Sequence, residues 1–281
     1  MKKIVLSLFS VALFTLADAQ VKTPQPSMSA DVEQVVGMTK IEVEYTRPSK
    51  NGRNIFGELV PYGKIWRTGA NKNTTIEFED DVIIEGQVLK AGKYAIYTVP
   101  EVSSWGIYFY ADTENWGNPR EWNDSKVMAK ASAKVEKLPY VVESFTISLD
   151  DLNLDSVTLN FAWDSVKVGI KIEVPTDRKV EESIVKTMKG KPTAQDYMAA
   201  ANYYYAAGKD IKQAKEWMDL GMKLNDKPAF YQIYQQALIH AKAGDKKSAI
   251  QLAEKSMEAS KAAGSEDYMN LCEKLIKELS E

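Results

Sequence analysis

The hydrophobic pattern of this 281-residue chain changes period near Pro175, and that change constrains the fold more than any other feature. Before it, apolar and polar residues alternate over 41–45, 157–163 and 166–174. A period of two puts one side of a strand on a core and the other in water. After it, apolar residues over 180–188 recur at the three-to-four spacing of a helix. We therefore predict an α+β chain, with an antiparallel β-sandwich or jelly-roll-like domain over 27–174 and an all-α domain over 176–281.

Shorter alternating runs bounded by Gly and Pro predict the remaining strands. They fall at 31–36, 74–78, 82–85, 94–99, 105–110 and 145–149. We place a turn at Asp164-Ser165, between the last two long runs.

The helical half contains two similar segments, 199–228 and 233–264, each with a glycine between two helix-length stretches. Those glycines, Gly208 and Gly244, lie 36 residues apart, and the tetratricopeptide repeat has a period of about 34. The spacing favours a tetratricopeptide-like unit of two helical hairpins with a capping helix at 266–279. A plain bundle of antiparallel hairpins remains the alternative.

The N-terminus has the three parts of a secretory signal peptide. Lys2 and Lys3 precede an apolar run over 4–16, and small residues at Ala17 and Ala19 mark a cleavage site before Gln20. We therefore predict a signal peptide over 1–19 and an exported protein, in the periplasm or outside the cell. No later stretch is apolar enough to span a membrane, which needs about 20 residues.

Composition excludes several classes of function. The formal net charge of −3 argues against nucleic acid, which would require a basic stripe. His240 is the single histidine and lies in the helical half, so the β-domain contains neither a Ser-His-Asp triad nor a His-based metal site. We predict no catalytic residue, cofactor or metal. Paired carboxylates have no fixed spacing in sequence, so a carboxylate-based hydrolase stays open.

The segment 47–71 is a long connection between strands that carries three arginines and its own apolar residues. Long ordered loops are often functional, and an arginine fork binds carboxylate or phosphate through two hydrogen bonds. The alternative is that the arginines pin the loop to backbone carbonyls and strand carboxylates. The candidate ligand residues in this segment are Arg47, Arg53, Glu58, Trp66, Arg67 and Asn71.

A second candidate surface lies in 105–122. Tyr108 and Tyr110 share a strand face, and Trp116 and Trp122 follow in the next loop. Such rings stack on sugars or anchor protein interfaces. The alternative is that they close one end of the sandwich.

The arginine segment reads RPSxxGRxIFGELVPYGxxWRTGAN, and AGKYAIYTVP follows at 91–100. Together they resemble the DUF2911 family of uncharacterised exported proteins from Bacteroidetes, over roughly 27–174. The resemblance implies export and a β-rich domain, and it supplies no catalytic residues.

Two hypotheses follow. In the first, this is an exported binding protein whose β-domain holds a small anionic or carbohydrate ligand, or a partner, and whose helical repeats bind a protein or peptide. In the second, the β-domain is a carboxylate-based hydrolase or another carbohydrate-active protein. A water-filled cleft with two carboxyl groups about 5–10 Å apart would favour the second.

Overall fold

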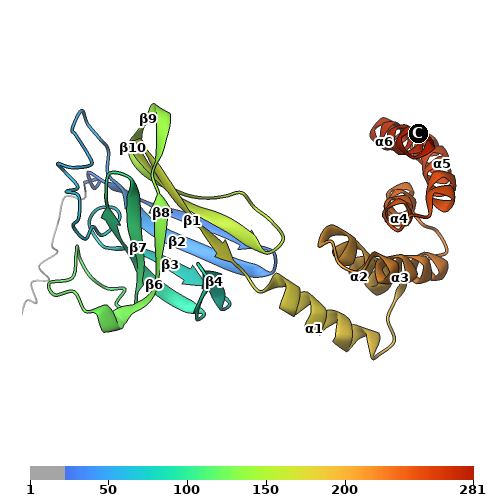
Figure 1. Cartoon of the computed structure of the whole chain (residues 1–281), viewed down its shortest axis with the longest axis horizontal. Coiled ribbons are helices and arrows are strands. Elements are labelled where there is room, and N and C mark those ends of the chain that lie inside the picture. The colour runs from blue at the N-terminus through green and yellow to red at the C-terminus, as the bar shows by residue number, and fades with distance from the viewer. Residues whose placement is uncertain (1–22) are drawn as a thin grey trace, which may run out of the picture.

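The computed structural model describes residues 23–281, which form a β-sandwich followed by helices (Figure 1). This confirms the predicted α+β order. The predicted signal peptide at 1–19 lies outside the described residues. Among residues 23–281, no helix has both the length and the hydropathy needed to cross a membrane.

Two antiparallel sheets build the sandwich. The six-stranded sheet has the order β1 (Met28–Val36), β2 (Thr39–Arg47), β3 (Thr74–Phe78), β6 (Gly92–Pro100), β7 (Ser104–Tyr110) and β8 (Val127–Lys134). The four-stranded sheet has the order β5 (Gln87–Leu89), β4 (Val82–Ile84), β10 (Ser156–Glu173) and β9 (Glu136–Asp150). A short 3-10 helix, Asp124–Lys126, precedes β8.

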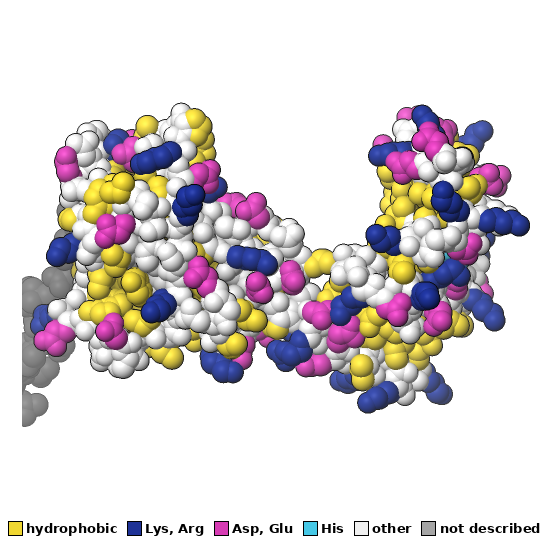
Figure 2. Space-filling model, in the orientation of Figure 1, with side chains coloured by type: hydrophobic (Ala, Val, Ile, Leu, Met, Phe, Trp, Pro, Cys, Tyr) yellow, Lys and Arg dark blue, Asp and Glu magenta, His cyan; other side chains and the backbone are white. Residues whose placement is uncertain are grey.

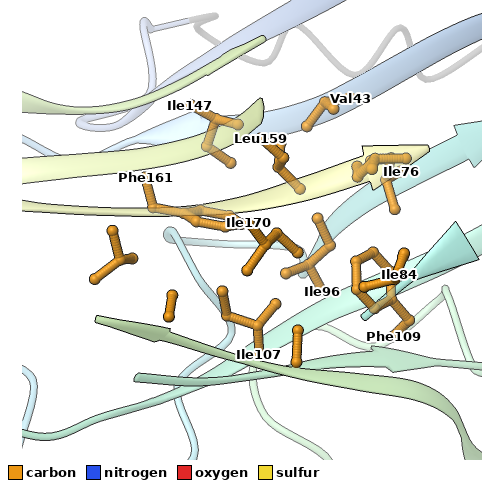
Figure 3. Packing of buried hydrophobic residues seen from close by; sticks show 14 of the residues in the cluster. Val43, Ile76, Ile84, Ile96, Ile107, Phe109, Ile147, Leu159, Phe161 and Ile170 are labelled. Carbon is orange, nitrogen blue, oxygen red and sulfur yellow. The ribbon is translucent and has the colours of Figure 1, made fainter. Parts of the chain in front are cut away.

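The core lies between the two sheets and is almost wholly apolar. Ile76, Ile96 and Ile107 point inward from the six-stranded sheet, and Leu159 and Phe161 meet them from β10 (Figure 3). Each of these side chains is completely buried. The alternation seen in the sequence therefore marks the inner faces of the two sheets.

The predicted turn at Asp164-Ser165 is wrong. Strand β10 runs unbroken through both residues, and Asp164 has a positive φ of 54°. The pairing of β10 with β9 shifts register on both sides of Asp164, which is the signature of a β-bulge. Lys50 reaches across from the arginine segment, with its Nζ 2.6 Å from the Asp164 carboxylate. Asp164 and Ser165 thus form a bulge within one strand, and not the chain-reversing turn that the sequence suggested.

The helical half begins at Thr176, two residues after the last core valine. Helices α2 and α3 pack against each other, as do α4 and α5, and α6 packs on α5 (Figure 1). Asp210 and Asp245 cap the second helix of each pair by accepting backbone N–H groups. The helices are α1 (Thr176–Met188), α2 (Ala194–Ala206), α3 (Ile211–Leu224), α4 (Phe230–Lys242), α5 (Lys246–Ala262) and α6 (Glu266–Ser280).

Helix α1 connects the sandwich to the other helices. Lys179 donates to the Met38 carbonyl at 2.8 Å and to the Asp80 carboxylate at 2.6 Å, which fixes α1 to the turn between β1 and β2 and to that between β3 and β4. At its other side, Asp177 accepts from the Tyr203 hydroxyl of α2 at 2.9 Å. Figure 2 shows charged side chains along this junction.

Candidate functional site

The arginine segment is an ordered connection between β2 and β3, held down by its own apolar side chains. Ile55 and Val60 are buried in the main core. Trp66 is joined to β6, because its backbone exchanges two hydrogen bonds with that of Thr98, of 2.8 and 2.9 Å. Its indole N–H donates to the Gly69 carbonyl at 3.1 Å. The loop thus has the fixed geometry that a binding site requires.

A cavity of about 330 Å³ opens between the two halves of this segment. Its base contains Trp66 and Trp163 of β10, whose rings stack with centroids 5.9 Å apart and planes inclined by 18°. None of the lining side chains is an Asp or a Glu. The lining residues are Pro26, Ser27, Pro48, Ser49, Asn51, Arg53, Leu59, Val60, Trp66, Arg67, Gly69, Ala70 and Trp163.

Two of the three arginines support the loop itself. Arg47 does not line the cavity; its Nε donates to the Phe145 carbonyl at 3.1 Å and its Nη2 to the Thr146 hydroxyl at 2.8 Å. Arg53 does line it, but its Nε donates to the Lys50 carbonyl at 2.9 Å and its Nη2 to the Ser49 carbonyl. These contacts fit the alternative interpretation of the sequence, in which arginines pin the loop to carbonyls.

Arg67 is different. Its guanidinium forms no hydrogen bond or ion pair with any residue between 23 and 281, and its Nε is buried from solvent without an acceptor. A buried donor without a partner costs about 1–3 kcal/mol. The tip of the side chain lies beside Gly117, where a Cβ would be 3.8 Å from Nη1. Arg67 is also one of the residues that line the cavity, and no carboxylate of residues 23–281 lies within ion-pair distance of it.

The other candidates in the segment do not reach the cavity. Glu58 accepts from the Asn54 amide at 2.8 Å and pairs with no arginine of the described chain. Asn71, with a positive φ of 59°, donates to the Ser27 carbonyl at 3.4 Å and so helps to hold the cavity rim. Both residues are structural parts of the loop in this arrangement.

The two tryptophans of the loop that follows β7, Trp116 and Trp122, have different surroundings. Trp122 packs on the outer face of the six-stranded sheet, stacked on Tyr110 with centroids 4.7 Å apart and edge-on to Tyr97 and Tyr108. Trp122 thus covers a small second core on the outer face of the sheet and has a packing role, although it does not close an end of the sandwich. Trp116 is 76 % exposed and lines no part of the cavity.

Sequence reasoning missed several residues of the site. Trp163 belongs to a strand about a hundred positions after the loop, so no local pattern links them. Leu59 was counted among the loop's packing residues, but it is 45 % exposed and lines the cavity. The signal that the sequence did contain was the density of arginines in 47–71.

The helical half contains a cluster of titratable groups around His240. His240 is buried, with Nε2 2.8 Å from the Asp219 carboxylate and Nδ1 3.2 Å from the Asp245 carboxylate. Burial raises the pKa of Asp219, but hydrogen bonds from His240 and Gln236 outweigh that effect and leave the pKa below its ordinary value. This cluster ties α3, α4 and the following turn together.

The lining of the cavity and the grouping of acidic side chains bear on carboxylate-based hydrolysis and on metal binding. The cavity of the arginine segment offers cations and indole rings but no pair of carboxylates, so the arrangement required for glycoside hydrolysis is absent from its lining. In residues 23–281, no three or more His, Cys, Asp and Glu side chains are grouped to hold a metal ion.

The comparisons with known proteins add one finding. No curated protein and no solved structure matches this chain. A family model described as "Protein of unknown function (DUF2911)" matches residues 27–172, which cover the sandwich, the arginine segment and the cavity. Because the match covers more than half of the chain, the protein belongs to the DUF2911 family.

Proposed function

We propose that this protein is an exported binding protein whose sandwich domain holds a small anionic ligand against Arg67. The observation that carries the proposal is the unpaired guanidinium of Arg67 in the wall of a cavity that no carboxylate lines. An anion in this cavity would accept hydrogen bonds from the two Nη groups of Arg67, which have no acceptor among residues 23–281. Charge-assisted hydrogen bonds of this kind are about twice as strong as neutral ones.

The test is calorimetric titration of acetate and inorganic phosphate into the mature chain and into Arg67→Gln. We expect the substitution to weaken binding at least about tenfold, because it removes the charge and the fork of donors. Arg178→Gln is the matched control, since Arg178 is an exposed arginine of α1 in a surface pair with Glu182. Equal anion affinity in the wild type and Arg67→Gln would refute the proposal.

A second binding surface is proposed for the helices, which we interpret as tetratricopeptide-like. A groove of about 240 Å³ is lined from α2, α3, α4 and α6, and no charged residue lines it. Its amides suit the N–H and C=O groups of an extended peptide. The lining residues are Gln195, Met198, Asn202, Met218, Tyr231, Gln232, Gln235 and Tyr268.

An array of uncharged peptides probed with the full chain tests this second surface. We expect the double substitution Asn202→Ala and Gln235→Ala to abolish the signal on the peptides that bind. Gln251→Ala, on the exposed face of α5, is the control that should leave it unchanged. Identical binding patterns for the wild type, the double variant and Gln251→Ala would show that the groove does not bind these peptides.

Export is the third part of the proposal, and it is supported by the signal-peptide pattern at 1–19. N-terminal sequencing of the protein recovered from the cell envelope or medium should begin at Gln20. Recovery from the cytosol with Met1 retained would contradict export.

A further inference from the structure

The apolar side chains that line the cavity narrow the class of anion that can bind there. We infer that the ligand is an organic carboxylate with an apolar carbon body, an inference that rests on the proposed anion binding and narrows it. Besides the two arginines, the cavity is bordered mainly by Leu59, Val60, Trp66 and Trp163, together with two prolines and an alanine. Leu59 leaves 45 % of its surface in water, although the segment around it packs into the core. A carbon body lying on this wall removes that apolar surface from water.

The same lining is poorly suited to an acidic sugar. Sugar hydroxyls need acceptors, and carboxylates are the strongest that side chains provide, but none lines this cavity. The side chains with acceptor oxygens are Ser27, Ser49 and Asn51, and the Ser49 hydroxyl already lies 3.2 Å from that of Ser144. Trp116, the exposed indole suited to stacking on a sugar ring, lies outside the lining.

Inorganic phosphate also fits less well than a carboxylate with a carbon body. Phosphate would pair with Arg67 but would leave the exposed part of the Leu59 side chain in contact with water. Each methylene group that covers such a wall strengthens binding by about fourfold, from the usual transfer free energy of a CH₂ group. The affinity should therefore rise with the length of the carbon chain until the cavity is filled.

The experiment titrates the mature full-length chain with acetate, butyrate and hexanoate, and with glucuronate, inorganic phosphate and 1-hexanol. Calorimetry gives the affinities, and indole fluorescence gives an independent readout because Trp66 and Trp163 line the cavity. We expect about fourfold tighter binding per added methylene from acetate to hexanoate. Glucuronate and phosphate should bind no better than acetate, and 1-hexanol, which lacks the charge, should bind at least tenfold more weakly than hexanoate.

Leu59→Ser is the decisive variant, because it should flatten the chain-length series while leaving acetate binding intact. Leu152→Ser, at an exposed leucine outside the segment, is the matched control and should keep the full series. Thermal unfolding of each variant checks its fold, and Leu59→Ala replaces Leu59→Ser if the latter unfolds.

The outcomes separate the two claims. Anions that bind through Arg67 with no dependence on chain length would overturn the carboxylate inference and leave the proposed function standing. Glucuronate binding tighter than hexanoate, or a chain-length series unchanged in Leu59→Ser, would overturn the inference in the same way. If no anion in the series binds at all, the proposed function fails, and the inference fails with it.

Discussion

The sandwich buries many large aliphatic and aromatic side chains, whereas the helices bury alanines and a few larger apolar side chains together with Ser256, Ser260 and His240. The sandwich has one large core between its sheets and the small Trp122 cluster on its outer face, whereas the helical half has two small clusters. Close approach of helix backbones across small residues buries less apolar surface per contact. The helical half therefore depends more on polar contacts such as those of His240 with Asp219 and Asp245. Hydrogen-exchange protection, which reports each region separately, can test this difference.

The largest expected effect lies in the sandwich core. Phe161→Ala removes a completely buried ring of β10 and should lower the free energy of unfolding of the sandwich by about 3–5 kcal/mol. Denaturant unfolding measures it, and Leu152→Ala, at an exposed leucine, should stay within about 0.5 kcal/mol of wild type. A loss below about 1 kcal/mol for Phe161→Ala would mean that the core between the sheets is not the single large unit described above.

The next effect belongs to the helices. His240→Ala removes the group that links two carboxylates on different elements, and should destabilise the helical half by about 1–3 kcal/mol. Hydrogen exchange should show faster exchange in α3 and α4 and unchanged protection in the sandwich. Lys242→Ala, at an exposed residue of the same helix, is the control. Equal loss of protection in both halves would show that they unfold as one unit.

A pair of arginine variants should separate support from binding within the sandwich. Arg47→Gln breaks hydrogen bonds to Phe145 and Thr146 and should lower stability by about 1–2 kcal/mol while leaving anion affinity unchanged. Arg67→Gln should do the reverse, because its buried Nε has no acceptor to lose. Denaturant unfolding and anion titration of both variants give the comparison. If Arg67→Gln lost stability but kept its anion affinity, Arg67 would be a structural residue and the proposed binding role would be wrong.

The smallest effect is the part of the pH dependence of stability that comes from Asp219 in the helices. The pKa of Asp219 is lowered in the folded chain, so its contribution to stability is present above the unfolded pKa of about 3.9 and is lost as the pH falls through the folded value. The side chain is 38 % exposed, so the loss should be below about 1 kcal/mol. Asp219→Asn should flatten the acid limb of the helical stability curve. An unchanged limb in that variant would assign the dependence to other carboxylates.

Much of the fold could be predicted because period-two and helical patterns report directly on burial. The predicted strand 74–78 matches β3, and the predicted helix ends at Gly208, Gly244 and Gly264 match the breaks between helices. Strand β8 escaped prediction because its buried residues are Ala129, Ala131 and Ala133, which carry a weak apolar signal. The turn at Asp164 was predicted from local polarity, but pairing across the sheet decides whether a polar pair makes a turn or a bulge.

The site was predictable in position but not in detail. The density of arginines in 47–71 pointed to the segment that borders the cavity. Which arginine is held by hydrogen bonds depends on the neighbouring strand that supplies the acceptors, as β9 does for Arg47 with the Phe145 carbonyl and the Thr146 hydroxyl. The contribution of Trp163 depends on the packing of the two sheets, which no local pattern encodes.

We propose above that the guanidinium of Arg67, which has no partner among residues 23–281, binds an anion. The most direct test follows the Arg67 Nε–H resonance in nitrogen-15 NMR spectra while hexanoate is added to the mature chain. The account predicts a saturable shift of this signal, with the Arg47 Nε–H signal unchanged because its donor is already bonded to the Phe145 carbonyl. An Arg67 signal that stays fixed at saturating hexanoate would contradict the account.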